Sequence, residues 1–327
     1  MRLCAALLMF LCLVATARAG GVCARDTAAA AALARLEEAM AHGRFVTYEP
    51  TTLMVRAGQV HEADAAGIRA DLTVLRGHFD GLITYDAVHG AQQVAPIAAQ
   101  LKFRALVIGV WNPFVPAEVD AALQAAQRYP QLVVGISLGN EMLFSHRADV
   151  PRLSAAVAAV RARLPALPLS VTEPFHLFEA PPGAALLPQL DFMLVNIHPV
   201  FQPWFAGSTE ATAAQFVVNV TGDLAARYCG PIIVKETGLP TGPAAAGFSA
   251  VRQARFYHEL QGRFAPSAQR AFAWFSAFDA PWRAQDDTGV PGGPHPEEAF
   301  WGLYDAQRRP KLAIDRLAGL EQDRPAR

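Results

Sequence analysis

Two apolar stretches that each end on a glutamate are the part of this sequence best suited to chemistry. Residues 132–141 read LVVGISLGNE, and residues 231–238 read PIIVKETG. Such apolar runs are typical of strands buried on both faces, as in a parallel sheet. A carboxylate at the carboxyl end of such a strand lies where parallel barrels place their catalytic residues. The pair Glu141 and Glu236 therefore suggests a site that cleaves glycosidic bonds. One carboxylic acid protonates the leaving oxygen, and the other carboxylate attacks the anomeric carbon or activates water.

A competing interpretation lies in the same stretch. Residues 135–139 fit the G-x-S-x-G pattern of serine esterases, with Ser137 as the nucleophile. That pattern requires the serine at a sharp strand-to-helix turn, whereas the predicted strand runs through Ser137. No His-Gly-Gly motif is present to form an oxyanion hole. The paired carboxylates are therefore favoured, with the esterase as a minor alternative.

An alternation of strands and helices must position these residues. Strands are predicted at 44–48, 82–85, 104–110, 132–138, 167–172, 192–196, 232–235 and 271–277. Helices are predicted near 26–42, 63–78, 90–101, 116–129, 148–163, 181–188, 209–228, 250–264 and 310–321. Eight strands alternating with helices, without a linker between halves, predict a single (β/α)₈ barrel. A doubly wound open sheet is the competitor, but the sequence has no G-x-G-x-x-G turn.

The sequence is predicted to consist of three parts. Residues 1–19 carry Arg2, an apolar run and an Ala-Arg-Ala motif, the pattern of a cleaved signal peptide. We expect export to the periplasm or the exterior, with a retained anchor as the alternative. Residues 20–43 form a helical extension and residues 44–327 the catalytic barrel. Cys23 and Cys229 remain after cleavage, so a single disulfide is expected in an oxidising compartment.

Charge and histidine placement exclude several kinds of partner. The formal net charge is −1 and the basic residues are dispersed, so neither nucleic acid nor a stable membrane partner is expected. The nine histidines form no i, i+4 pair on a helix and there is no cysteine cluster. We therefore predict no metal and no cofactor, and we expect a monomer.

Polar and aromatic residues gather at the same strand ends as the glutamates. Sugar rings present apolar C–H faces, for which aromatic side chains supply a flat surface. The residues expected to contact substrate are Asn140, Asn196, His198, Tyr48, Tyr85, Trp111, Phe278, Asp279 and Trp282. The longest irregular stretch, residues 279–302, follows the last strand and would lie over the active face of a barrel.

Five motifs in order resemble glycoside hydrolase family 17. They are GNE at 139–141, VNIHP at 195–199, VKETGLP at 234–240, FSAFDAPW at 275–282, and WGLYD at 301–305 followed by Pro310-Lys311. The likeness extends from about Phe45 to Lys311. Leu239 replaces the tryptophan that usually follows the second catalytic motif, and a Tyr or Leu is commoner where His198 stands.

The resemblance implies a (β/α)₈ barrel that acts on β-1,3-glucans with retention of configuration. By motif match, Glu141 is the general acid/base, Glu236 is the nucleophile, and Asn140 orients the substrate. Some relatives transfer glucosyl units instead of hydrolysing them, with the same two carboxylates. We expect Glu141 to carry the higher pKa of the pair, because two neighbouring carboxylates cannot ionise independently. The alternative from another class is a catalytically silent carbohydrate-binding barrel.

Overall fold

The predicted barrel is confirmed. The computed structural model describes residues 21–24, 27–285, 295–315 and 317. Parallel strands close into a barrel in the order β1-β10-β9-β8-β7-β6-β5-β4. Their bounds are β1 Phe45–Tyr48, β4 Gly81–Thr84, β5 Ala105–Val110, β6 Val133–Asn140, β7 Leu169–Pro174, β8 Met193–Asn196, β9 Ile232–Glu236 and β10 Arg270–Trp274. Each lies on a predicted strand, because a strand covered on both faces has to be apolar along its length.

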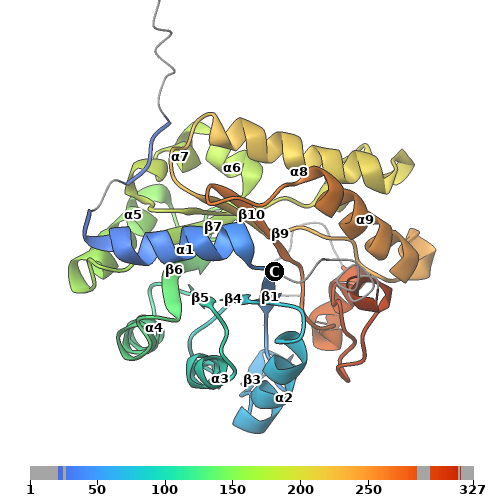
Figure 1. The fold of residues 1–327 in the computed structure, drawn as a ribbon, viewed down its shortest axis with the longest axis horizontal. Coiled ribbons are helices and arrows are strands. Elements are labelled where there is room, and N and C mark those ends of the chain that lie inside the picture. The colour runs from blue at the N-terminus through green and yellow to red at the C-terminus, as the bar shows by residue number, and fades with distance from the viewer. Residues whose placement is uncertain (1–20, 25–26, 286–294, 316, 318–327) are drawn as a thin grey trace, which may run out of the picture.

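Helices surround the barrel, as Figure 1 shows. Their bounds are α1 Ala30–His42, α2 Ala65–Leu75, α3 Val94–Gln100, α4 Pro116–Arg128, α5 Val150–Arg163, α6 Phe175–Glu179, α7 Pro181–Ala184, α8 Glu210–Ala225 and α9 Ala250–Arg263. Short 3₁₀ turns lie at η1 Thr27–Ala29, η2 Ala91–Gln93, η3 Leu187–Gln189, η4 Pro199–Phe201, η5 Phe205–Gly207, η6 Ala244–Ala246, η7 Pro281–Gln285 and η8 Pro296–Phe300. The predicted helix at 181–188 is thus divided between α7 and η3.

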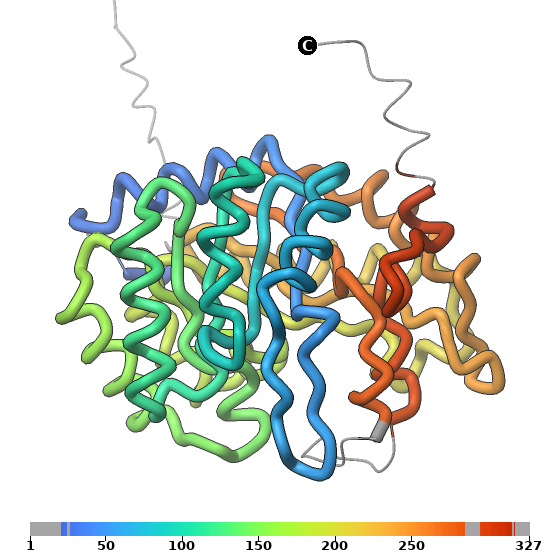
Figure 2. The backbone as a smooth tube through the Cα atoms, turned by 90° about the horizontal axis from the view of Figure 1, so that it is seen from below, coloured from blue at the N-terminus to red at the C-terminus, as the bar shows by residue number. Residues whose placement is uncertain are grey.

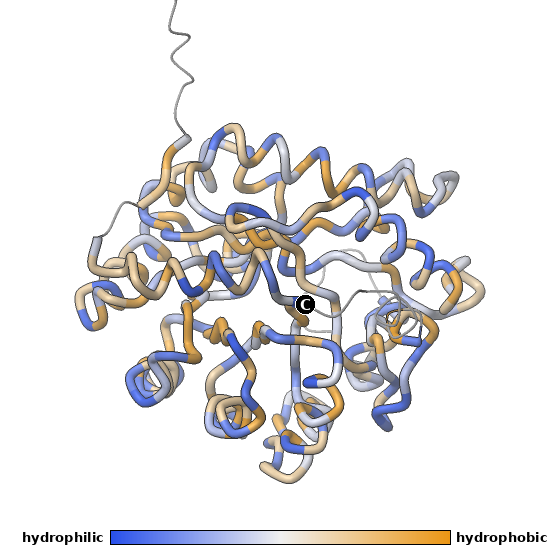
Figure 3. The backbone as a smooth tube through the Cα atoms, in the orientation of Figure 1, coloured by the Kyte–Doolittle hydropathy of each residue, from blue (hydrophilic) through white to orange (hydrophobic). Residues whose placement is uncertain are grey.

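Local chemistry explains where the longer helices begin. Asp64, Asp149, Thr209 and Ser249 precede α2, α5, α8 and α9, and each side chain accepts a hydrogen bond from a backbone N–H of the first turn. This satisfies one of the amide groups that a helix start leaves without a partner. Figure 3 shows hydrophilic and hydrophobic residues alternating along these helices, so that each buries one side on the barrel.

The amino-terminal helix closes the bottom of the barrel. Leu36, Ala39 and Met40 of α1 are buried together with the first residues of the strands, among them Phe45 and Ala105. A disulfide joins Cys23 to Cys229, just before β9, with the Cα atoms 5.4 Å apart, as the sequence predicts. In Figure 2, α1 lies along one end of the barrel. That end is the one opposite Glu141 and Glu236, which lie at the carboxyl ends of β6 and β9.

A two-stranded hairpin is the main element that the sequence did not predict. Strands β2 (Met54–Arg56) and β3 (Gln59–His61) pair antiparallel and project from the end opposite α1 (Figure 2). Their residues are exposed or only partly buried, so they lack the apolar pattern that identified the barrel strands. Hairpin strand β2 packs against η7.

Two predictions concern residues beyond those described. The signal peptide at residues 1–19 lies outside them, as does part of the last predicted helix, 310–321. In the described part of the chain, no helix combines the length and apolar character needed to cross a membrane.

Candidate active site

An irregularity in strand β6 places Glu141. The pairing of β6 with β7 shifts register between Ser137 and Asn140, and bulges of this kind re-aim side chains next to active sites. Gly139 has a φ of +88°, which glycine adopts at no steric cost. Glu141 itself has a φ of +54°, a conformation that costs a non-glycine residue free energy. The strand end is therefore bent so that Glu141 lies at the carboxyl mouth of the barrel.

The loop after Glu141 is held from three sides. The hydroxyl of Ser145 donates to the carbonyl of Glu141 at 2.5 Å, and Arg147 Nη2 donates to the carbonyl of Asn140 at 2.5 Å. The carboxylate of Glu173, at the end of β7, accepts the backbone N–H groups of Leu143 at 2.8 Å and Phe144 at 3.2 Å. These contacts offset the cost of the backbone conformation at Glu141.

A second register shift places Glu236. It falls between Val195 and Asn196 in the pairing of β8 with β9, and brings Asn196 opposite Glu236. Lys235 precedes Glu236 and is 2% exposed. Its Nζ lies 3.2 Å from Glu236 Oε1 and donates to Asn140 Oδ1 at 2.5 Å. The ammonium group thus connects the carboxylate of β9 with the amide of β6.

Neutral and basic groups complete the contacts of the two carboxylates. Asn196 Nδ2 donates to Glu141 Oε1 at 2.8 Å. His198 Nε2 lies 3.3 Å from Glu236 Oε2. The rings of Phe275 and Trp301 lie 5.2 Å and 5.3 Å from the His198 ring and fix its position. Asn140, Asn196 and His198, all predicted to contact substrate, therefore lie directly at the glutamates.

These surroundings separate the pKa values of the two glutamates in the expected direction. Burial raises the pKa of Glu141, and the negative charge of Glu236 raises it further. Burial would also raise the pKa of Glu236, but Lys235, His198 and Arg283 lower it to about 2. At neutral pH, Glu236 is an anion, and Glu141 is the carboxyl group that holds a proton more readily. Such a pair of carboxyl groups could supply one proton donor and one anion for chemistry.

A cavity of about 260 Å³ opens at the mouth of the barrel, and neither Glu141 nor Glu236 is part of its lining. Tyr85, Phe278, Asp279 and Trp282, which the sequence predicted as substrate-binding residues, are part of its lining. The other lining residues are Glu49, Pro50, Thr51, Met54, Ser276, Ala280, Pro281, Arg283, Glu298, Trp301, Ala306 and Gln307. Mixed aromatic and polar walls of this kind suit a sugar.

Two predicted binding residues lie elsewhere. Tyr48 is fully buried, and its hydroxyl donates to Asp71 Oδ2 at 2.8 Å. Its prediction as a substrate contact is wrong, because the position at a strand end does not determine the direction of the side chain. Trp111 is 45% exposed after β5, with the guanidinium of Arg147 4.8 Å from its ring centre. It does not line the cavity.

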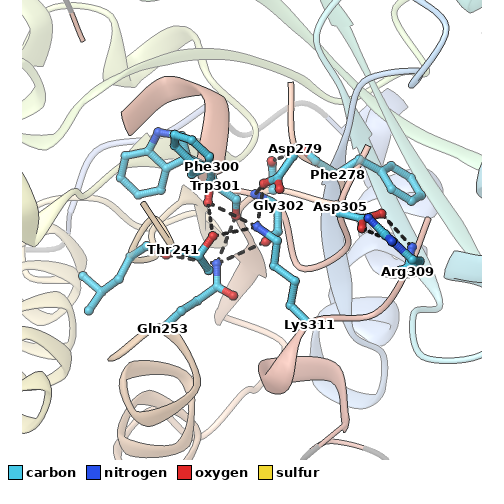
Figure 4. A network of polar contacts seen from close by, with 12 residues as sticks. Thr241, Gln253, Phe278, Asp279, Phe300, Trp301, Gly302, Asp305, Arg309 and Lys311 are labelled. Atoms are coloured by element: carbon cyan, nitrogen blue, oxygen red, sulfur yellow. Dashed lines mark hydrogen bonds and ion pairs between the residues drawn. The ribbon is translucent and has the colours of Figure 1, made fainter. Parts of the chain in front are cut away.

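Asp279 reaches the cavity but is held within the protein. Its Oδ1 accepts from Lys311 Nζ at 2.6 Å and from the backbone N–H of Gly302 at 2.9 Å. Figure 4 shows Lys311 pointing into this network together with Thr241 and the carbonyl of Phe300. Asp279 therefore fixes the cavity wall at residues 300–302.

The structure excludes the serine esterase interpretation. Ser137 lies inside β6 and is 3% exposed, and its hydroxyl is 2.9 Å from the hydroxyl of Thr172 on the neighbouring strand. No strand-to-helix turn presents it to a substrate. Within the described residues, no group of three or more His, Cys, Asp or Glu side chains could hold a metal ion.

Sequence reasoning missed the cations of the site. The sequence could have indicated Lys235, because a lysine inside a buried strand requires a charged partner. No sequence pattern indicates Arg283, since it lies in the irregular stretch after β10. It contacts Glu49 Oε2 through Nε at 3.2 Å and Nη2 at 2.9 Å, across more than 200 residues of sequence.

Comparison with known proteins gives consistent matches. A family model described as "BtgE/BtgC glycoside hydrolase domain" matches residues 46–302. A protein named glucan 1,3-beta-glucosidase from Arthroderma benhamiae is 26% identical over 281 residues, 80% of this chain and 88% of that protein. A glycoside hydrolase family 17 beta-1,3-glucanosyltransferase from Rhizomucor miehei has a TM-score of 0.61 at 19% identity, covering 82% of this chain and 95% of that one. Its active-site mutant in complex with laminaritriose also has a TM-score of 0.61, at 18% identity, covering 83% of this chain and 96% of that one. These two structures share the barrel fold.

Proposed function

This chain belongs to the family of BtgE/BtgC glycoside hydrolase domains, and from that premise we propose that it is a retaining enzyme that cleaves or transfers β-1,3-linked glucans. The membership agrees with the resemblance that the sequence motifs indicate. Relatives named for glucan 1,3-beta-glucosidase and beta-1,3-glucanosyltransferase activity support the choice of substrate.

The observation that carries the proposal is that the pKa values of the two glutamates are shifted in opposite directions. A retaining glycosidase needs a carboxylic acid beside the leaving oxygen and an anion below the anomeric carbon. The pKa of Glu141 is raised by burial and by Glu236, whereas Lys235 and His198 outweigh burial and lower the pKa of Glu236 to about 2. A barrel that only binds carbohydrate would not require the pKa values of the two glutamates to differ.

In the first step, Glu141 donates its proton to the glycosidic oxygen while Glu236 attacks the anomeric carbon. The bond from that carbon to the leaving oxygen breaks, and an ester to Glu236 forms. Asn196 donates to Glu141 Oε1, which leaves Oε2 to carry the proton. As negative charge leaves Glu236, the pKa of Glu141 falls, because the repulsion that raised it is lost.

In the second step, the ionised Glu141 acts as a base. It removes a proton from a water molecule or from a sugar hydroxyl, whose oxygen then attacks the anomeric carbon and releases Glu236. Hydrolysis and glycosyl transfer therefore differ only in the acceptor.

We further propose that residues 1–19 direct export and that the mature chain is a monomer. The disulfide between Cys23 and Cys229 supports an oxidising compartment. Amino-terminal sequencing of protein from cell fractions should give a mature start near Gly20, and size-exclusion chromatography with light scattering should give the monomer mass. A start at Met1 in the membrane fraction would instead indicate a retained anchor.

Stereochemistry provides the direct test of the mechanism. Purified protein is mixed with a laminari-oligosaccharide, and the first products are followed by proton NMR before they mutarotate. We expect the β-anomer to form first, and Glu236→Gln and Glu141→Gln to lack this activity. Initial release of the α-anomer would contradict retention, and inactivity of the unaltered protein would contradict the proposed substrate.

A further inference from the structure

Arg147 holds both carbonyl groups that flank the Cα atom of Glu141. Its Nη2 donates to the carbonyl of Asn140 at 2.5 Å. Its Nε donates to the hydroxyl of Ser145 at 2.9 Å, and that hydroxyl donates to the carbonyl of Glu141 at 2.5 Å. The φ angle of Glu141 is the rotation between these two carbonyl groups, so fixing both of them fixes its positive φ of +54°.

The guanidinium group suits this task because its donors have fixed directions. Arginine presents a planar fork of N–H donors, whereas the ammonium of lysine is a compact point charge. One side chain can therefore hold two acceptors at a set separation, here the Asn140 carbonyl and the Ser145 hydroxyl. Among the described residues, the contacts of the guanidinium are to a carbonyl, a hydroxyl and an aromatic ring, and none is to a carboxylate. Its contacts thus serve the turn and not an ion pair.

The guanidinium also lies against the loop that follows β5. Its central carbon is 4.8 Å from the centre of the Trp111 ring, the distance of a cation–π contact. The backbone N–H groups of Trp111 and Asn112 donate to the carboxylate of Glu118 in α4, which fixes the start of this loop. Arg147 therefore connects the turn at Glu141 to the neighbouring strand β5.

The other neighbour of β6 holds the same turn with the opposite charge. Strand β6 lies between β5 and β7 in the barrel. From β7, the carboxylate of Glu173 accepts the backbone N–H groups of Leu143 and Phe144. An anion thus binds amide groups of the turn while a cation binds its carbonyl groups, and charged partners make such hydrogen bonds stronger. Of these two, Arg147 is the residue that acts on the backbone of Glu141 itself.

We propose that Arg147 is a positioning residue for proton transfer, which places the carboxyl group of Glu141 at the glycosidic oxygen by fixing the carbonyl groups on either side of it. The inference rests on the proposed function and adds a residue that acts through Glu141 and not on the sugar. A misplaced acid slows the departure of leaving groups that need a proton and has little effect on those that leave as stable anions.

A series of substrates that differ only in the leaving group tests this. Aryl β-laminaribiosides of phenols from dinitrophenol to weakly acidic phenols are compared, and log(kcat/KM) is plotted against the pKa of the phenol. This parameter reports formation of the glycosyl-enzyme and does not depend on how fast the ester is later hydrolysed. In the unaltered protein, proton donation by Glu141 should keep the slope of the plot shallow.

Arg147→Lys keeps the positive charge and loses the planar fork. We expect a steeper slope, because kcat/KM should fall at least about tenfold for the least acidic phenol and less than about twofold for dinitrophenol. An equal loss on every substrate would indicate a general disturbance of the site, and an unchanged plot would indicate no role. Either result would overturn the inference and leave the glucan activity of the unaltered protein intact. If the unaltered protein cleaves neither this series nor laminari-oligosaccharides, the proposed function fails, and the inference with it.

Ser145→Ala is the second variant and decides the question if Arg147→Lys does not fold. It removes only the hydroxyl between Arg147 and the carbonyl of Glu141, so the slope should increase in the same direction, with an added loss of about threefold for the least acidic phenol. An unchanged slope in this variant would contradict the proposal.

Arg152→Lys is the matched control. Its guanidinium also lies on an aromatic ring of the loop after β5, 3.7 Å from the centre of Phe114, but it contacts neither Asn140 nor Ser145. This variant should keep the slope of the unaltered protein. A slope as steep as that of Arg147→Lys would mean that any arginine on this side of the barrel has the same effect, contrary to the proposal.

Discussion

The two ends of the barrel differ in what their residues do. At the carboxyl mouth, the strands that lead to Glu141 and Glu236 both have a register shift in their pairing, and Gly139 and Glu141 have positive φ angles. Polar atoms of Asn196, His198 and Thr237 are buried there without a hydrogen-bond partner among the described residues. At the opposite end, α1 packs an apolar layer against the strand starts, and a disulfide fixes the segment before it.

The two ends therefore differ in how their residues are expected to affect activity and the free energy of unfolding. Strained backbone and unpaired polar atoms each reduce stability, and they persist only where the surrounding structure holds them. The apolar layer between α1 and the strand starts forms the floor of the barrel and stabilises it through burial. Changes at the mouth should therefore alter activity, whereas changes at the floor should alter stability.

Loss of the nucleophile is expected to have the largest effect. Glu236→Ala should reduce kcat on laminari-oligosaccharides by at least about 10⁴-fold, because the covalent step is lost. Azide should restore turnover of an aryl β-glucoside that has a good leaving group, and the product should be the α-glycosyl azide, because azide enters the space that the carboxylate vacates. A β-azide would assign the nucleophile to another residue.

Loss of the acid/base should depend on the leaving group. Glu141→Ala should reduce turnover of oligosaccharides by about 10²–10⁴-fold, the usual contribution of proton transfer. Formation of the glycosyl-enzyme from a dinitrophenyl glycoside should be nearly unaffected, because that leaving group needs no proton. Azide should here give the β-glycosyl azide. If turnover of both substrates fell equally, Glu141 would not be the general acid/base.

The buried lysine should set the acidic limit of activity. Burial raises the pKa of Glu236, but the charge of Lys235, with His198 and Arg283, lowers it to about 2, so ionised Glu236 persists over the whole accessible pH range. In Lys235→Met that pKa should rise toward or above its ordinary value of 4.5. Activity requires the anion, so the acid limb of the pH–rate profile should move to higher pH.

Lys311→Met is the matched control for that experiment. Lys311 is partly buried and also paired with a carboxylate, Asp279, but it does not contact Glu236. This variant should leave the acid limb of the profile where it is. A shift of similar size in both variants would indicate a general effect of losing a buried charge.

The sequence predicted the barrel better than it predicted the site. Apolar strands such as 105–110 are recognisable because a doubly covered strand is apolar at every position. The two glutamates were recognisable because their strands end on them. The direction of Tyr48, the pairing of Arg283 with Glu49 and the hairpin β2–β3 depend on contacts between distant segments or on exposed residues. No local pattern encodes these features.

A smaller effect is expected from Glu173, which holds the loop that follows Glu141. Glu173→Gln keeps one acceptor oxygen for the amides of Leu143 and Phe144 and loses the other, which should lower kcat/KM about tenfold through poorer placement of the acid. The pKa of Glu173 is raised to about 7, chiefly by burial and in part by the charge of Glu141. Replacing Glu173 by the neutral glutamine removes this interaction between the two carboxyl groups, so the alkaline limb of the pH–rate profile should move to lower pH above that value.

Glu118→Gln is the control for the Glu173 variant. The carboxylate of Glu118 accepts backbone N–H groups of Trp111 and Asn112 in the same manner, in a loop without a catalytic residue. It should leave the alkaline limb unchanged. If both variants shift that limb equally, Glu173 has no particular role in positioning Glu141.

The disulfide at the floor should have the smallest effect on catalysis. It closes a loop with a sequence separation of 206 residues, and chain-entropy arguments give such a closure up to about 5 kcal/mol of stability. The double variant Cys23→Ser with Cys229→Ser should therefore unfold at lower urea concentration. Its kcat/KM at 25 °C should stay within about twofold of the unaltered protein, because Glu141 and Glu236 lie at the opposite end of the barrel. If the folded double variant lost most of its activity while its unfolding in urea was unchanged, the disulfide end would affect catalysis and not stability, contrary to this prediction.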